Sequence, residues 1–165
     1  MKKRNKFFPV IVFCLAVFFL PFSTPASPGD PNPIRLKDNL FSIDFVNPNQ
    51  GWAVGYYGAI LHTEDGGKSW TYQPSGKKIV FTDVDFVDPD NGWVVGYGPT
   101  ILHTTDGGKT WSEQKISEDI FLTAVHFLND KRGWVVGEWG TILVTEDGGN
   151  TWNSQLSGGD AILYD

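Results

Sequence analysis

Cysteine, basic charge and long apolar runs are all scarce in this chain. The single cysteine, Cys14, lies in an apolar stretch near the N-terminus, so the rest of the chain has no disulfide, no thiol nucleophile and no Cys-ligated metal. Beyond residue 26, nine Lys and Arg face nineteen Asp and Glu, a net charge of −10. This acidic balance argues against binding to nucleic acid or to anionic lipid headgroups.

The only long apolar run is near the N-terminus. A basic start (KKRNK), the apolar run FFPVIVFCLAVFFL and the small-residue tail PFSTPAS are the three parts of a secretory signal. They predict a signal peptide over residues 1–26, cut after Ala26, with an uncleaved anchor as the alternative. The remainder is then exported to a periplasmic, lumenal or extracellular space without membrane insertion. Residues 27–39, rich in Pro and polar groups, read as a linker.

Everything after the linker repeats at a spacing of 41 residues. The repeated features are a Gly-Trp pair, a phenylalanine and a second tryptophan. They occur at Gly51-Trp52, Gly92-Trp93 and Gly133-Trp134, at Phe45, Phe86 and Phe127, and at Trp70, Trp111 and Trp152. Periods of about 40–45 residues with strand patterning are typical of propeller blades.

Each copy divides into four short strands separated by Gly, Pro, Asn or Asp. In the first copy they are expected at 40–46, 51–56, 59–63 and 69–73, with a tight turn before the third. The predicted fold class is therefore an all-β propeller of four-stranded antiparallel blades. The blades are placed at about 40–75, 81–116 and 122–157, and a stub of a fourth at 158–165.

Three blades and a stub predict an incomplete ring, since propellers close with about 4–8 blades. Two explanations stay open. The sequence is a fragment of a longer gene, or two or more chains join by self-association through their unclosed blades.

The most specific local motif is an octapeptide: TEDGGKSW, TTDGGKTW and TEDGGNTW. Its Asp opens a hairpin turn and accepts hydrogen bonds from turn N–H groups, while the paired glycines take positive φ. The tryptophan is expected to bury its ring between neighbouring sheets. The motif has no nucleophile or proton relay, so these residues are predicted to be structural: Asp65, Gly66, Gly67, Trp70, Asp106, Gly107, Gly108, Trp111, Asp147, Gly148, Gly149 and Trp152.

These octapeptides resemble the Asp-boxes (BNR repeats) of sialidases, some endoglucanases and other propellers. Joined to GW(A/V)VG at constant spacing, three times over 40–165, they resemble the photosystem II assembly and stability factor family. The resemblance implies a non-enzymatic binding or assembly module outside the cytoplasm. Photosynthetic members are known for an Arg-rich interaction surface, which this chain lacks because only Arg35 and Arg132 follow residue 26. The alternative is a fragment of an Asp-box glycoside hydrolase.

No catalytic, cofactor or metal site emerges from the residues. A sialidase needs three arginines to grip a carboxylate, because guanidinium supplies the bidentate fork. A glycosidase needs two paired carboxylates, and no two non-recurring acids are marked as a pair. His62 and His103 recur on separate blades and are predicted to face solvent.

Partner binding is the remaining class. The turns between second and third strands share one face of a propeller with the blade-to-blade connections. Exposed aromatics there suit a protein partner, including a membrane-protein complex, or a glycan. Alternatively, these aromatics only cover the blade ends. The candidate binding residues are Tyr56, Tyr57, Tyr97, Glu138 and Trp139, with Lys77, Lys78 and Lys115 nearby.

Overall fold

A computed structural model describes residues 39–117, 119–159 and 161–164. The predicted signal peptide (1–26) and residues 27–38 of the predicted linker lie outside the described residues, so both remain predictions. Within the described ranges, no helix is long and apolar enough to cross a bilayer.

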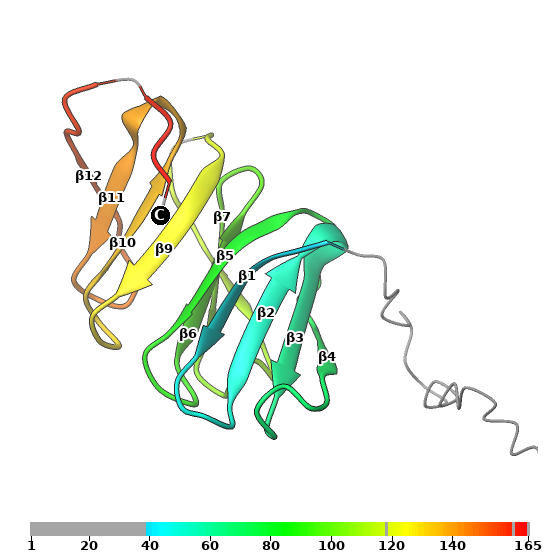
Figure 1. Ribbon diagram of the computed structural model, residues 1–165. Coiled ribbons are helices and arrows are strands. Elements are labelled where there is room, and N and C mark those ends of the chain that lie inside the picture. The colour runs from blue at the N-terminus through cyan, green and yellow to red at the C-terminus, as the bar shows by residue number, and fades with distance from the viewer. Residues whose placement is uncertain (1–38, 118, 160, 165) are drawn as a thin grey trace, which may run out of the picture. The chain divides into compact units, whose positions relative to one another are not determined.

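Three four-stranded antiparallel sheets make up the described chain (Figure 1). The first contains β1 (Leu40–Phe45), β2 (Gly51–Gly55), β3 (Ala59–Thr63) and β4 (Thr71–Pro74). The second contains β5 (Phe81–Phe86), β6 (Gly92–Gly96), β7 (Thr100–Thr104) and β8 (Ser112–Gln114). The third contains β9 (Leu122–Phe127), β10 (Gly133–Gly137), β11 (Ile142–Thr145) and β12 (Asn153–Gln155). Strands follow chain order within each sheet, which is the blade arrangement predicted from the repeat.

The fourth strand of the first blade begins at Thr71, two residues later than predicted. The strand begins later because Ser69 is hydrogen-bonded within the preceding octapeptide turn. The Ser69 N–H donates to Asp65 Oδ1 at 2.9 Å and its hydroxyl donates to Asp65 Oδ2 at 2.6 Å. These bonds lower the pKa of the Asp65 carboxyl to about 2.

A buried threonine completes each octapeptide turn. Thr63 Oγ1 donates to Asp65 Oδ1 at 2.9 Å and accepts the Gly67 N–H at 2.9 Å. The same pair of bonds recurs around Thr104 and Thr145. Sequence reasoning assigned no role to this threonine, although it opens all three octapeptides.

Successive blades are joined by a contact that we call the blade latch. In the first latch, the Trp52 ring is fully buried and stacks on Phe86 of the next blade, with centroids 3.6 Å apart. Its indole N–H donates to the carbonyl of Gly107, in the next blade's octapeptide, at 3.2 Å. A Cβ on Gly92 would lie 2.4 Å from the Phe86 ring, so only glycine fits beneath the stack. The two repeated motifs therefore meet across each blade boundary.

The second latch repeats the first, 41 residues further along the chain. Trp93 stacks on Phe127 at 3.5 Å and donates to the Gly148 carbonyl at 3.3 Å. Gln114 Nε2 donates to the same carbonyl at 2.6 Å. A Cβ on Gly149 would come within 1.9 Å of the Gln114 amide oxygen. In the second and third octapeptides, the second glycine thus has a positive φ and also lies against a glutamine of the preceding blade.

Two expectations about aromatic rings need correction. The octapeptide tryptophans, such as Trp111, are only partly buried, and the fully buried tryptophans of the described chain are Trp52 and Trp93 of the Gly-Trp pairs. His62 and His103 do not simply face solvent. Each stacks on the latch tryptophan of its own blade, at 4.7 and 4.5 Å, because a flat imidazole covers the ring face that the phenylalanine leaves free. Burial lowers the pKa of both histidines.

The first strands of successive blades are joined by side chains. The Phe86 N–H donates to Asp44 Oδ2 at 2.8 Å, and the Phe127 N–H donates to Asp85 Oδ2 at 2.6 Å. Burial raises the pKa of Asp85 to about 6, although the bond from Phe127 and the neighbouring His126 oppose this shift. Recurring acids on the first strands thus connect one blade to the next.

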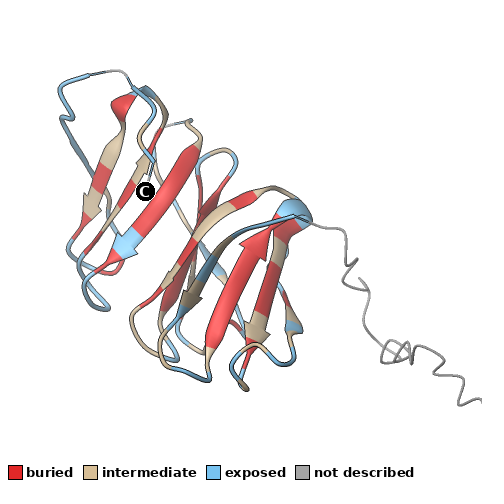
Figure 2. Cartoon of the chain, viewed as in Figure 1, coloured by how far each residue is buried: buried red, intermediate tan, exposed pale blue. Residues whose placement is uncertain are grey.

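The first blade leaves one apolar face uncovered among the described residues. Its β1 strand is largely exposed, whereas the equivalent β5 strand of the middle sheet is buried or half-buried along its length (Figure 2). Ile43 and Phe45 keep 58% and 40% of their surface exposed, whereas the equivalent Val84 and Phe86 keep 4% and 6%. The difference arises because a preceding blade's tryptophan covers the Phe86 ring.

The latch predicts unequal costs for two repeat-equivalent tryptophans. Trp93→Ala empties a fully buried site between two blades and should lower the free energy of unfolding by about 3–5 kcal/mol. Trp134→Ala, at a partly buried position, should lower the free energy of unfolding by about 1 kcal/mol. Urea denaturation measures both, and equal losses would contradict the latch.

Asp85 predicts a pH-dependent stability difference. The pKa of Asp85 is raised in the folded chain. Its contribution to the free energy of unfolding is therefore fully present below pH 3.8 and is lost as pH rises through about 6. Asp85→Asn keeps an oxygen to accept the Phe127 N–H but does not ionise. As pH rises between these values, the free energy of unfolding of the variant should increase by about 1–2 kcal/mol relative to that of the native chain, after allowance for partial solvation. Denaturation of both proteins across this range measures the gain, and a pH-independent difference would contradict it.

Candidate functional site

The face opposite the octapeptide turns carries the predicted binding residues, and we call it the loop face. It consists of the β2–β3, β6–β7 and β10–β11 turns together with the blade-to-blade connections (Figure 1). Backbone bonds fix the two sets of loops to each other. The Gly58 N–H donates to the Ile79 carbonyl at 2.6 Å, and the Tyr97 N–H donates to the Val80 carbonyl at 2.8 Å.

Four of the predicted residues are exposed aromatics on this face. Tyr57, Tyr97 and Trp139 keep 66%, 63% and 72% of their surface exposed, and Tyr56 keeps 37%. Tyr56 and Tyr57 lie on the first blade with ring centroids 6.0 Å apart. Tyr97 lies on the second blade and Trp139 on the third, so the set is spread across all three blades.

Two of these aromatics are held in a strained backbone conformation. Tyr57 and Trp139 each have φ of 57°, and they are the positive-φ residues other than glycine in the described chain. Both occupy the middle of a three-residue 3₁₀ turn, η1 (Tyr56–Gly58) or η2 (Glu138–Gly140). The equivalent residue of the second blade is Gly98, with φ of 69°. The turn therefore requires a left-handed residue, and two blades place a large ring where glycine is the unstrained choice.

Backbone strain at an exposed residue points to a functional role for that residue. Left-handed backbone costs a residue with a Cβ about 1–2 kcal/mol, and residues kept in it cluster at ligand-contacting sites. Tyr57 and Trp139 have little burial that would compensate for the strain. Their rings are thus presented to solvent at an energetic cost.

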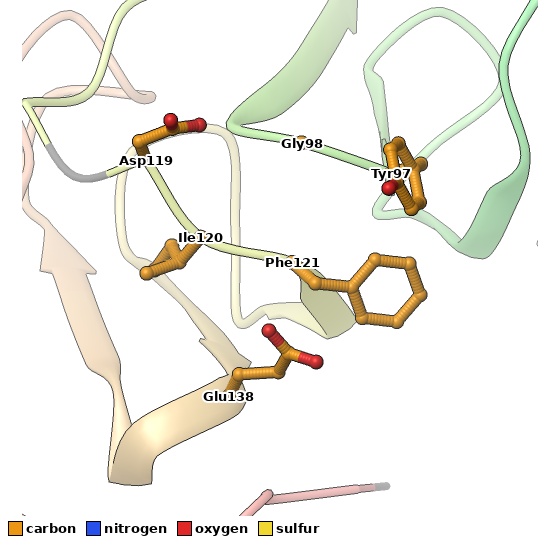
Figure 3. A pocket seen from close by; sticks show the side chains of 6 residues that line it. All are labelled: Tyr97, Gly98, Asp119, Ile120, Phe121 and Glu138. Carbon is orange, nitrogen blue, oxygen red and sulfur yellow. The ribbon is translucent and has the colours of Figure 1, made fainter.

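A groove lies between the second and third blades on the same face (Figure 3). Its volume is about 450 Å³, and it is lined by Tyr97, Gly98, Asp119, Ile120, Phe121 and Glu138. Tyr97 and Phe121 meet edge to face, with centroids 5.6 Å apart. The structure therefore brings together the predicted Tyr97 and Glu138.

Sequence reasoning missed Asp119, Ile120 and Phe121 as parts of this groove. They belong to the connection into β9, whose path the strand periodicity does not specify. One signal was available, because Phe121 replaces the Val80 and Asn39 found at equivalent positions of the other repeats.

The loop face also carries charged side chains. Lys77, one of the lysines expected near the site, pairs with Glu113 at 2.7 Å. Within residues 39–117, 119–159 and 161–164, no group of three His, Cys, Asp or Glu side chains could hold a metal ion. The absence of catalytic and cofactor sites remains a prediction.

The strained turn predicts a reversal of the usual preference for alanine over glycine. Trp139→Ala removes the ring but keeps a Cβ in left-handed backbone, whereas Trp139→Gly removes both. The glycine variant should be the more stable of the two by about 1 kcal/mol. Gly98→Ala provides the converse control. Nothing lies within 4 Å of the added Cβ, so backbone strain alone should lower the stability of this variant. Thermal denaturation compares the variants, and a more stable Trp139→Ala would contradict the assigned conformation.

Comparison with known proteins gives the family. The family described as "Photosynthesis system II assembly factor YCF48" matches residues 28–118 and 73–159. The chloroplastic photosystem II stability/assembly factor HCF136 of Cyanidioschyzon merolae is 48% identical over 40 residues, which is 23% of this chain and 9% of that protein.

Solved structures agree on the fold. YCF48 bound to D1 peptide is 26% identical with a TM-score of 0.70, and covers 76% of this chain. YCF48 from Cyanidioschyzon merolae is 34% identical with a TM-score of 0.65, and covers 74%. This chain spans 42% and 41% of those two chains. A GH74 enzyme of Niastella koreensis, 17% identical with a TM-score of 0.53 over 70% of this chain and 18% of its own, shares the fold alone.

These likenesses confirm the β-propeller architecture that the 41-residue repeat predicted. The family match runs from residue 28 to residue 159, which is most of the chain. The chain therefore belongs to the photosystem II assembly factor YCF48 family of BNR-type β-propeller proteins.

Proposed function

We propose that this chain is a non-enzymatic protein-binding module that assists assembly of a membrane-protein complex outside the cytoplasm. The observation that carries the proposal is the pair of strained, exposed aromatics at equivalent turns of the first and third blades, Tyr57 and Trp139. Large aromatic side chains with few rotatable bonds are the residues that most often dominate protein interfaces. Family membership supports this choice, since a YCF48 relative has been solved with a D1 peptide.

The proposed extracytoplasmic location is supported by the sequence of residues 1–26, which has the three parts of an export signal. Beyond residue 26 the chain carries only two arginines, Arg35 and Arg132, and nineteen Asp and Glu. We therefore place the contact on the aromatic side chains of the loop face.

A fluorescently labelled D1 peptide is the direct probe of this function. The purified chain should bind it, and the double change Tyr57→Ala with Trp139→Ala should weaken binding about tenfold or more. Leu128→Ala is the matched control, because Leu128 is also exposed, at 61%, but lies in the β9–β10 connection at the opposite end of the sheets. Fluorescence anisotropy measures all three proteins.

Two outcomes would contradict the proposal. If the native chain does not bind the peptide, recognition of a D1-like segment is wrong. If it binds and the loop-face variant is unchanged, the chosen face is wrong. Unchanged melting temperatures in the variants exclude unfolding as the cause of a loss.

Glycan binding, glycoside hydrolysis and self-association remain predictions. A panel of chromogenic glycosides tests hydrolysis, and turnover abolished at one non-recurring carboxylate would favour the alternative of an Asp-box hydrolase. Light scattering tests self-association through the apolar face of the first blade, where Ile43 and Phe45 are exposed.

A further inference from the structure

The groove between the second and third blades combines apolar and aromatic side chains with two carboxylates. Ile120, Phe121 and Tyr97 contribute the apolar and aromatic side chains, and Tyr97 keeps 63% of its surface exposed (Figure 3). Asp119 and Glu138 contribute the carboxylates. All of these groups line one opening of about 450 Å³.

The walls of the groove are fixed by main-chain bonds. The Tyr97 N–H donates to the Val80 carbonyl at 2.8 Å, and the Glu138 N–H donates to the Phe121 carbonyl at 3.0 Å. The edge-to-face contact of Tyr97 with Phe121 joins the second blade to the connection that enters the third. The backbone of the groove is therefore preorganised, and a ligand need not order it.

No cation of the described chain neutralises the carboxylates of the groove. The ion pairs among the described residues are Lys77–Glu113, Arg132–Glu146 and the contact of His126 with Asp85. None of them includes Asp119 or Glu138. With a net charge of −10 beyond residue 26, the surrounding chain also repels anions and attracts cations.

We propose that this groove accepts a cationic side chain, best an arginine, from an extended basic segment of the partner protein. A guanidinium stacks on aromatic faces and at the same time forms charge-assisted hydrogen bonds with carboxylates. The rings of Tyr97 and Phe121 supply the first contact, and Asp119 and Glu138 supply the second. This inference rests on the proposed function, and it names the chemistry of the segment that the loop face binds.

Two labelled peptides test the inference, each an uncharged Gly/Ser chain that carries either three arginines or three glutamates. The chain should bind the arginine peptide by fluorescence anisotropy, more weakly as salt is raised, and should not bind the glutamate peptide. Asp119→Asn combined with Glu138→Gln should weaken binding about tenfold. Phe121→Ala should weaken it several-fold, because the stacking surface is lost.

A matched double variant distinguishes binding in the groove from general attraction of the peptide to the negative charge of the chain. Glu64→Gln with Asp90→Asn removes the same charge from exposed positions at the opposite end of the sheets, and should leave binding within about twofold. An equal loss in both double variants would overturn the groove as a specific site. Equal binding of the two peptides would overturn the cationic segment.

The result is distinguishable from failure of the proposed function. If the D1 peptide binds through Tyr57 and Trp139 while the arginine peptide does not bind, the proposed function stands and the groove assignment is wrong. If neither peptide binds, both are wrong. The isosteric amide variants keep the groove's shape, and their melting temperatures show that the fold is intact.

Discussion

The stacking of a buried tryptophan on a phenylalanine of the next blade is the contact on which the rest of this structure depends. Trp52 on Phe86, and Trp93 on Phe127, fill the space between sheets that share no backbone ladder. The indole N–H reaches an octapeptide carbonyl in the following blade, so the two repeated motifs function as one unit. The middle blade supplies one half of a latch to the blade before it and one half to the blade after it, so both motifs recur at the same 41-residue spacing.

The loop face, where we propose that recognition occurs, lies at the end of the sheets opposite the octapeptide turns. In the octapeptide turns, the carboxylates of Asp65, Asp106 and Asp147 accept local hydrogen bonds, which lower their pKa values. On the loop face, by contrast, large rings are exposed and two of them strain the backbone. Under the proposed function, stability and binding lie at different ends of the same blades, as expected for a scaffold that presents loops on a rigid sheet.

Much of the fold could be predicted from sequence because the pattern of strands and turns in one blade occurs three times. Strand positions, turn residues and chain order within each sheet followed from alternating patterns between glycines. Ring partners could not be predicted in the same way. Whether Trp52 or Trp70 is the buried ring, and whether His62 faces solvent or stacks, depends on how one blade faces the next, and periodicity within a blade does not contain that information.

The candidate site was only half visible in the sequence for a related reason. Tyr97 and Glu138 stood out as loop residues, but their groove is completed by Phe121, in an irregular connection whose path is set by packing. The strained conformation was encoded, since Tyr57 and Trp139 align with Gly98, yet it becomes evident only when the turn is known to need a left-handed residue.

Hydrogen exchange of the indole N–H groups, followed by NMR, tests the latch most directly. The Trp52 and Trp93 indoles are buried and bonded across blade boundaries, so they should exchange only when the blades separate or unfold. The indole of Trp139, 72% exposed, should exchange rapidly and serves as the internal reference. Exchange at Trp93 as fast as at Trp139, under conditions where the β-sheet amides remain protected, would contradict the central role given to this contact.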